Sequence, residues 1–253
     1  MKLTVLGSGT LVSGPERATT GFVLEIGGQP IVVDLGFGCL KNMQRAGVDF
    51  SKVNNLFFTH FEHLDHVNDL SAFIFARKGL VDLGYSSPVQ INLFGGQGFK
   101  GFVERLLDAY PVLKNLPFKL VASDLDAFGT RRFGDFTIKA KPMSHVPSSI
   151  GMRFEAGQKS VVFSGDTESN ENIVELAKRA DLLVLECNYG EEAPKWNHLN
   201  AEIAGGIAAK AGAKALLLSH LLPETEKQNL KKMASKKFSG EITVAKDLLE
   251  VNV

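Results

Sequence analysis

Strand-like and helix-like patterns alternate along the whole chain, and this alternation restricts the fold more than any other feature. In both halves, glycine turns separate short apolar strand patterns, and longer amphipathic segments follow them. Strands are predicted at 2–6, 20–26, 30–34, 55–59, 89–93, 136–140, 149–155, 160–164, 182–185, 215–219 and 242–245. Helices are predicted at 69–78, 99–110, 170–179, 200–211 and 225–238. Such alternation favours a layered α/β architecture over a helical bundle or an all-β barrel. Because no linker, repeat or low-complexity segment interrupts it, we predict a single domain over residues 1–253.

Composition excludes several other classes of protein. Twenty-eight Lys and Arg residues balance twenty-eight Asp and Glu residues, so no net charge draws the chain to nucleic acid or to a membrane surface. The N-terminal segment lacks the pattern of a signal peptide, and no apolar run approaches the roughly 18 residues of a membrane span. Cys39 and Cys187 lack CxxC spacing and are expected to be reduced, buried thiols. We therefore expect a cytoplasmic protein.

The six histidines all lie at or just beyond the end of a strand-like run, or in a loop. Three of them crowd into the segment THFEHLDH, which follows the apolar run LFF. The six are His60, His63, His66, His145, His198 and His220. Asp166, in the segment SGDT, also follows an apolar run. Because the ends of neighbouring strands present their side chains to a shared crevice, these residues are expected to meet.

Imidazole and carboxylate groups are the ligand set for zinc, iron or manganese. His63, Asp65 and His66 lie too close together in sequence to bind one ion through a regular strand. A loop that turns into a helix would instead direct them to two adjacent ions, and His145, Asp166 and His220 are placed to complete both. A carboxylate such as Asp166 can bridge two cations about 3.5–4 Å apart. The sequence therefore predicts a dinuclear hydrolytic site.

These motifs resemble the metallo-β-lactamase superfamily, in its ribonuclease Z-like and phosphodiesterase-like branch. The hallmark of that branch is H-x-H-x-D-H after a strand, followed by a lone His, a bridging Asp and a final His. The counterparts here are His60, His63, Asp65, His66, His145, Asp166 and His220. The resemblance covers nearly the whole chain, from LGSGTLVSGPERATTGFVLE and IVVDLGFG to ITVAKDLLEV. It implies a four-layer αββα sandwich and two divalent metal ions, zinc in the first place, with manganese and iron as alternatives.

The resemblance also implies a role for each residue of the site. His60, His63 and His145 would hold the first metal, Asp65, His66 and His220 the second, and Asp166 would bridge them. A hydroxide bridging the metals would attack the ester, with Asp65 as metal ligand and as acceptor of the hydroxide proton.

Glu186 and His198 match a family pair near the leaving group, in which the carboxylate orients the His as general acid. The alternative for Glu186 is a strand-end carboxylate in a surface ion pair.

One departure from the family pattern concerns the first two histidines. The family has one residue between them, whereas this chain has Phe61 and Glu62. We interpret this as one inserted residue that a bulge absorbs, which leaves His60 and His63 as ligands and Glu62 pointing away. The rival is ligation by His60 and Glu62, as in the diiron flavoproteins of the same superfamily. That arrangement would favour iron or manganese as the metal. The diiron flavoproteins carry an additional flavin domain, which this sequence does not show.

The absence of one family segment, the tRNA-binding arm, restricts the class of substrate that we expect. The tRNA-binding arm of the family is inserted between the lone His and the bridging Asp, but only twenty-one positions separate His145 from Asp166. Because affinity for nucleic acid depends on phosphate neutralisation, zero net charge also argues against tRNA. We expect a small anionic ester as substrate, such as a small phosphodiester, a cyclic nucleotide or a sulfate ester.

Phosphodiester hydrolysis is the first of three functional hypotheses. The second is an arylsulfatase or another ester, thioester or lactone hydrolase, and the third is a metal-binding or iron redox protein without hydrolase turnover. Specificity loops are expected at about 77–87 and 190–197, and Arg17 and Ser148 are candidates for contacts with an anionic substrate. Homodimers are common among relatives, so the resemblance implies a homodimer as well.

Overall fold

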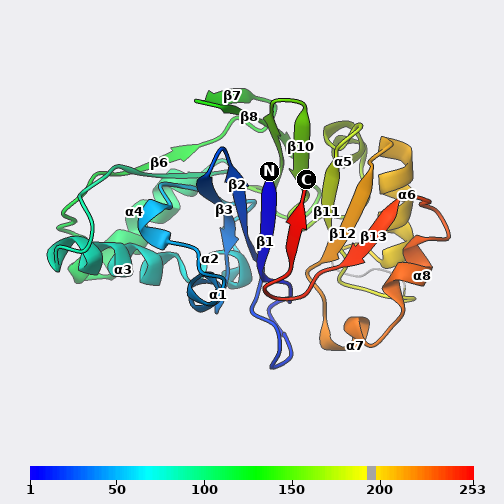
Figure 1. The fold of residues 1–253 in the computed structure, drawn as a ribbon, viewed down its shortest axis with the longest axis horizontal. Coiled ribbons are helices and arrows are strands. Elements are labelled where there is room, and N and C mark those ends of the chain that lie inside the picture. The colour runs from blue at the N-terminus through cyan, green and yellow to red at the C-terminus, as the bar shows by residue number, and fades with distance from the viewer. Residues whose placement is uncertain (193–197) are drawn as a thin grey trace.

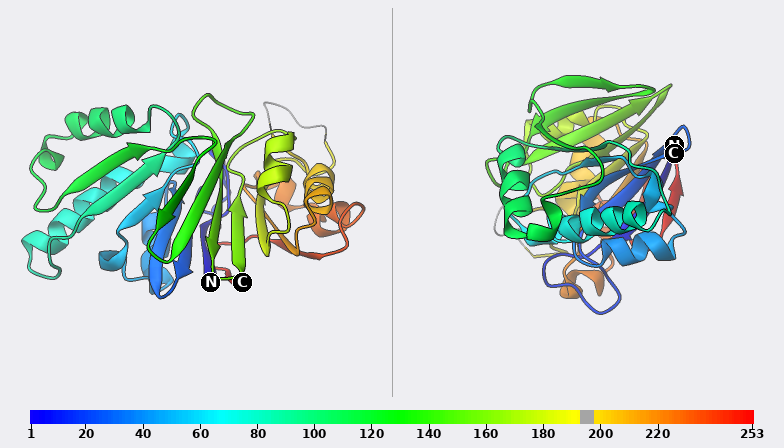
Figure 2. Two further views of the ribbon diagram at one scale, coloured as in Figure 1. Left: turned by 90° about the horizontal axis from the view of Figure 1, so that it is seen from above. Right: turned by 90° about the vertical axis from the view of Figure 1, so that its left-hand side faces the viewer.

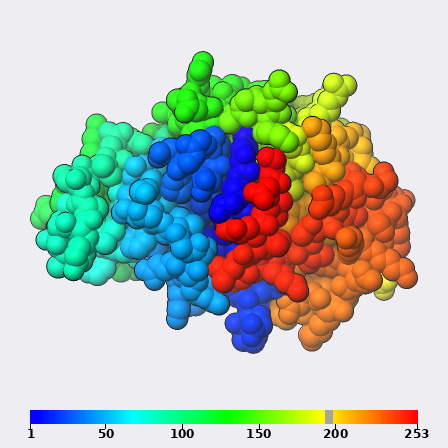
Figure 3. Space-filling model, in the orientation of Figure 1, coloured from blue at the N-terminus to red at the C-terminus, as the bar shows by residue number. Residues whose placement is uncertain are grey.

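Two seven-stranded sheets pack face to face in the computed structural model, which describes residues 1–192 and 198–253 (Figure 1). The first sheet has the order β14-β1-β2-β3-β4-β5-β6, with antiparallel pairing from β14 to β3 and parallel pairing from β3 to β6. Its strands are β1 (Lys2–Gly7), β2 (Gly21–Ile26), β3 (Gln29–Leu35), β4 (Asn55–Phe57), β5 (Ile91–Gly95), β6 (Leu120–Asp124) and β14 (Glu250–Asn252). Because β14 pairs with β1, the two ends of the chain lie side by side on the surface (Figure 3).

The second sheet has the order β13-β12-β11-β10-β9-β8-β7. An antiparallel meander from β7 to β10 continues as parallel pairing from β10 to β13. Its strands are β7 (Thr130–Phe133), β8 (Phe136–Pro142), β9 (Ile150–Ala156), β10 (Lys159–Phe163), β11 (Leu182–Glu186), β12 (Ala215–Ser219) and β13 (Glu241–Val244). The central strands β11 and β12, LLVLE and ALLLS, are almost continuously apolar because both of their faces are covered.

Helices cover the outer face of each sheet (Figure 2). On the first sheet they are α1 (Cys39–Arg45), α2 (Leu64–Val67), α3 (Leu70–Asp82) and α4 (Phe99–Ala109), with short 3₁₀ helices at Phe50–Lys52 and Pro111–Leu113. On the second sheet they are α5 (Glu171–Leu176), α6 (Ala201–Ala211) and α8 (Leu230–Ala234), whereas the short helix α7 (Pro223–Glu226) lies at the bottom of the molecule in Figure 1. The predicted four-layer αββα sandwich is therefore confirmed.

Three hydrophobic clusters match the three interfaces between these layers. One lies between the sheets, one beneath the helices of the first sheet and one beneath those of the second. In the cluster between the sheets, the ring of Phe57 contacts Phe94, Phe133 and Phe154, with centroids 4.8–5.4 Å apart. Each fully buried side chain of this kind contributes roughly 1.5–3 kcal/mol. Cys39 and Cys187 are free, buried thiols, as expected.

Several predicted boundaries differ from the structure. The segment predicted as one helix over 225–238 forms α7 and α8, because the Asn229 side chain accepts a hydrogen bond from Lys232 N and starts a new helix. The helix predicted at 170–179 ends at Leu176. The strands β6 and β7 were not predicted, because the short sequence LVASD is only partly buried and TRRF is largely polar and exposed.

The expected specificity loop at 77–87 is largely helical. The helix α3 continues to Asp82, and Arg77 is buried with its guanidinium donating to the carbonyl oxygens of Phe50 and Val53. Arg77 thus fixes α3 to the preceding loop. The other expected loop, at 190–197, lies outside the described residues from 193 onward. Among the helices that the structure describes, none is long and apolar enough to cross a membrane.

Candidate metal centre

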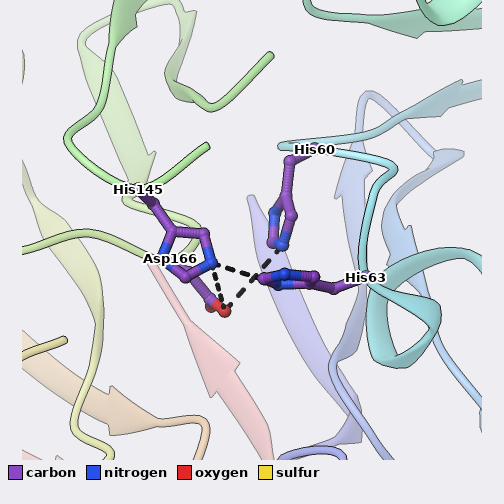
Figure 4. A group of neighbouring side chains, drawn as sticks. All are labelled: His60, His63, His145 and Asp166. Atoms are coloured by element: carbon purple, nitrogen blue, oxygen red, sulfur yellow. Dashed lines mark hydrogen bonds and ion pairs between the residues drawn. The ribbon is translucent and has the colours of Figure 1, made fainter. Parts of the chain in front are cut away.

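The polar side chains of the site come from segments that follow four strands at one edge of the sandwich. His60 follows β4, His145 lies between β8 and β9, Asp166 follows β10, and His220 follows β12. The side chains of His60, His63, His145 and Asp166 converge on one point (Figure 4). The strand-end pattern in the sequence is thus reproduced as a spatial cluster.

One group of candidate ligands consists of His60, His63, His145 and Asp166, each of which offers a ligand atom within 4.8 Å of the others. The Oδ2 atom of Asp166 lies 3.9 Å from His60 Nε2 and 3.7 Å from His145 Nε2. His145 Nε2 lies 3.1 Å from His63 Nδ1. Three imidazoles and one carboxylate therefore surround one small volume.

A second group consists of Asp65, His66 and His220, and it adjoins the first through Asp166. His220 Nε2 lies 3.3 Å from Asp65 Oδ2 and 3.4 Å from Asp166 Oδ2, and His66 Nε2 lies 3.2 Å from Asp166 Oδ1. The carboxylate of Asp166 thus lies between the two groups.

The local backbone explains how close neighbours in sequence reach both groups. His63 is extended and immediately precedes α2, whereas Asp65 and His66 lie within that short helix. His220 adopts a left-handed conformation with φ of 60°. A residue other than glycine is strained in this region, and such strain is concentrated at functional sites.

Asp34 contacts the second group through His66, although the sequence patterns did not indicate it as a site residue. It ends the predicted strand at 30–34, is buried, and has φ of 56°. Its Oδ1 accepts a hydrogen bond from Thr59 N and its Oδ2 one from Thr59 Oγ1, both at 2.8 Å. Its Oδ2 also lies 2.9 Å from His66 Nδ1. A carboxylate on one ring nitrogen fixes the tautomer and turns the other nitrogen, here Nε2, toward the ligand cluster. A lone Asp at the end of an apolar strand was the available signal.

The pKa values of two histidines in the cluster are shifted in opposite directions. Burial, together with the neighbouring His66, lowers the pKa of His60 well below its usual range. Burial also lowers the pKa of His66, but Asp166 and Asp34 outweigh it, so that this pKa is raised. Burial raises the pKa of Asp166, yet His220 and His66 hold it well below its usual range. The pKa of Asp65 is likewise lowered, because His220 and His66 outweigh burial. The carboxylates therefore stay ionised.

These residues fit divalent cations. Among the residues that the structure describes, the buried atom His60 Nε2 has no hydrogen-bond partner, and His66 Nε2 and Asp166 Oδ1 lie 3.2 Å apart as an ion pair without hydrogen-bond geometry. Each such atom costs about 1–3 kcal/mol unless something satisfies it. Ligand atoms about 2.0–2.2 Å from a tetrahedral zinc ion lie roughly 3.3 Å apart, and the distances here are of that size. A set of imidazoles and carboxylates without thiolate suits zinc, manganese and iron.

The two residues between His60 and His63 point away from the cluster. The ring of Phe61 stacks on Phe102 of α4, with centroids 5.1 Å apart. Glu62 is exposed, and its carboxylate accepts a hydrogen bond from Ser148 Oγ. The structure thus brings His63, and not Glu62, to His145.

Glu186 and His198 form a pair beside the cluster. His198 Nδ1 lies 2.8 Å from Glu186 Oε1, and the carboxylate also accepts hydrogen bonds from Thr167 N at 2.8 Å and Leu199 N at 3.1 Å. Burial lowers the pKa of His198, but Glu186 outweighs it, so that this pKa is raised. The ring of His198 lies 5.0 Å from that of His145, centroid to centroid. Glu186 is 3% exposed, so the alternative of a surface ion pair is wrong.

The two candidates for contacts with an anionic substrate are occupied elsewhere. The guanidinium of Arg17 donates to Ser8 Oγ and to the carbonyl oxygen of Ala245, and it pairs with Glu226. Arg17 therefore fixes the loop after β1. Ser148 is 2% exposed and donates its hydroxyl hydrogen to Glu62.

Comparison with known proteins gives consistent matches over the whole chain. Residues 1–238 match the family model of the anti-Pycsar protein Apyc1. The chain is 30% identical to the probable metallo-hydrolase YhfI of Bacillus subtilis, over 97% of each chain. The crystal structure of YhfI superposes on this structure with a TM-score of 0.88, over 99% of this chain and 98% of YhfI. It is 28% identical to ribonuclease Z of Mycobacterium avium, over 100% of this chain and 98% of the relative. The short form of human tRNase Z, 21% identical over 100% of this chain and 99% of the other, shares the fold with a TM-score of 0.81.

Proposed function

The chain belongs to the anti-Pycsar protein Apyc1 family and is a metal-dependent hydrolase of the metallo-β-lactamase fold, related to YhfI and ribonuclease Z, and from this premise we propose that it hydrolyses small phosphodiesters. The observation that carries the proposal is the pair of adjoining ligand groups with Asp166 between them. Two cations held side by side suit an anionic ester, because they neutralise the charge that grows on its oxygens.

The proposed ligands divide into two sets. His60, His63 and His145 would hold one cation, Asp65, His66 and His220 would hold the other, and Asp166 would bridge them. Zinc is the first candidate for both sites, with manganese and iron as alternatives. When bound, the cations supply Lewis-acid polarisation of the ester and lower the pKa of a water molecule toward neutrality.

The protein side chains then orient the reactants and move protons. Because the pKa of Asp65 is lowered, its carboxylate stays ionised and can accept the hydrogen bond of the attacking water. Glu186 holds Nδ1 of His198, so the transferable proton of this ring is the one on Nε2. His198 donates this proton to the oxygen of the leaving alcohol, as a general acid.

The size of the substrate follows from what connects His145 to Asp166. In this part of the chain the structure describes only the hairpin of β9 and β10, with a turn at Gly157 and Gln158. No segment there has the length of the tRNA-binding arm expected between these two residues. The ribonuclease Z relatives act on RNA, as their name says, but for this chain we propose a small phosphodiester instead.

The proposal is tested by metal analysis and activity of one preparation. We expect protein purified without added metal to contain two equivalents of zinc, manganese or iron, and to hydrolyse bis(p-nitrophenyl) phosphate faster than p-nitrophenyl sulfate. A protein that binds metal but hydrolyses neither compound would contradict the proposal. Hydrolysis of the sulfate ester alone would favour the arylsulfatase hypothesis.

The role of His198 predicts an effect that depends on the leaving group. We expect His198→Ala to lower kcat roughly 10²–10⁴-fold for a dinucleoside monophosphate, whose alkoxide needs a proton. The loss should be much smaller for bis(p-nitrophenyl) phosphate, because p-nitrophenolate departs without protonation. Glu186→Gln should show a weaker form of the same contrast. Equal losses on both substrates would show that His198 is not the acid.

A further inference from the structure

The loop that carries His60 and His63 is one residue longer than the pattern that this chain resembles. If both histidines are to reach one cation, the loop must dispose of the added length. The side chain of Phe61 does so by turning outward, where its ring lies 5.1 Å from that of Phe102 and 5.9 Å from that of Phe99. This contact fixes one side of the loop on α4.

Glu62 fixes the other side of the loop on a different segment. Its Oε2 accepts a hydrogen bond from Phe61 N at 3.1 Å, which closes the turn, and a second one from Ser148 Oγ at 2.5 Å. Glu62 thereby connects the loop of His63 to the loop of His145. His145 precedes Ser148 by three residues.

The loop that contains Ser148 is itself rigidly held. Ser148 is 2% exposed, and its carbonyl oxygen packs so closely on Gly96 that a Cβ there would lie 1.9 Å away. Ser149 N donates to Val146 O at 2.9 Å, and Ile150 N donates to Thr59 O at 2.9 Å. Ser148 is therefore a fixed anchor, whereas Glu62 belongs to an exposed turn.

The two loops meet at their histidines as well, since His145 Nε2 lies 3.1 Å from His63 Nδ1. A ring of contacts thus closes through His63, Glu62, Ser148 and His145. Removal of the hydrogen bond between Glu62 and Ser148 would leave His63 on a longer turn that is held only on the side of Phe61.

We propose that Glu62 is a positioning residue that, through Ser148, holds His63 in place for the first cation and so compensates for the added residue. This inference rests on the proposed metal centre. A partner that orients a ligand, rather than binding the metal, typically changes metal affinity by roughly 10- to 100-fold. The effect should fall on the cation held by His60, His63 and His145, because the other group is supported separately: Asp65 and His66 lie in α2, Asp34 contacts His66, and His220 follows β12.

The test measures the affinities for the two zinc ions separately, by competition with a chromogenic chelator. In Glu62→Ala and in Ser148→Ala we expect one affinity to fall roughly 10- to 100-fold while the other stays unchanged. Glu62→Gln should bind both ions like the unmodified protein, because its amide oxygen still accepts both hydrogen bonds. The double variant should be no weaker than either single variant, since both remove the same bond. Glu104→Ala, an exposed carboxylate of α4, is the matched control.

Each other outcome contradicts a particular statement. Unchanged affinities in Glu62→Ala would overturn the positioning role, while two zinc ions in the unmodified protein would leave the proposed function intact. If Glu62→Gln loses one ion as fully as Glu62→Ala, the carboxylate itself is a ligand, and the inference is wrong. If the unmodified protein binds fewer than two ions, the proposed centre fails first. The thermal midpoint of the metal-free variants shows whether any of them fails to fold.

Discussion

Replacement of Asp166 by asparagine should lower kcat/KM for a phosphodiester at least roughly 10³-fold. The carboxylate lies 3.2–3.9 Å from the Nε2 atoms of His60, His66, His145 and His220, so it is the only proposed ligand shared by both groups. Replacement of the carboxylate by an amide removes one negative charge from between the two proposed cations. These cations would stabilise the charge of the transition state by several kcal/mol. Metal analysis should find less than two equivalents in this variant.

Asp181→Asn is the matched control for this experiment. Asp181 is a largely buried carboxylate that precedes β11, at the end of the strand opposite Glu186, and it accepts a hydrogen bond from Ser160 N at 2.8 Å. Its replacement should lower stability while metal content and kcat/KM stay close to those of the unmodified protein. Asp166→Asn with full metal content and activity would show that this carboxylate bridges nothing.

His63→Ala should lower activity by roughly 10²-fold or more and should remove one of the two cations. The reason is geometric, because His63 is the residue of its loop that meets His145, at 3.1 Å, whereas the carboxylate of Glu62 is bonded to Ser148. Loss of an imidazole leaves the first cation with two histidines and the shared Asp166. Activity and metal content measured on the same samples check both parts of the prediction.

The comparison of His63→Ala with Glu62→Gln decides between the two ligand hypotheses. If His63 is the ligand, the first variant loses roughly 10²-fold or more of its activity and the second keeps it. The reverse pattern, with activity kept in His63→Ala and lost in Glu62→Gln, would favour ligation by His60 and Glu62 and therefore iron or manganese.

Sequence patterns predicted most of the fold because its central strands are buried on both faces. Continuously apolar runs such as LLVLE and ALLLS indicate strands that are buried on both faces. Their alternation with helices then favours a layered α/β fold over a helical bundle or an all-β barrel. Patterns failed where burial is weak. The polar strand β7 lies at the edge of its sheet, next to β8, so its sequence TRRF carries little apolar signal. Within 225–238, the cap at Asn229 divided a helix-like periodicity into two helices.

The same physical limits apply to the site. The ends of strands predicted which histidines would meet, because a parallel sheet brings those ends to one edge. Asp34 was missed because its role depends on a contact with His66, thirty-two positions away, which no local pattern reveals. The contact between Glu62 and Ser148 spans eighty-six positions, so only the structure shows where the added residue goes.

The most direct measurement is anomalous diffraction at the absorption edge of the metal found in the purified protein. We expect two peaks about 3.5–4 Å apart, the first within bonding distance of His60, His63 and His145, the second of Asp65, His66 and His220, with Asp166 between them. A single peak, or a first peak bonded to Glu62 in place of His63, would contradict the proposed dinuclear centre.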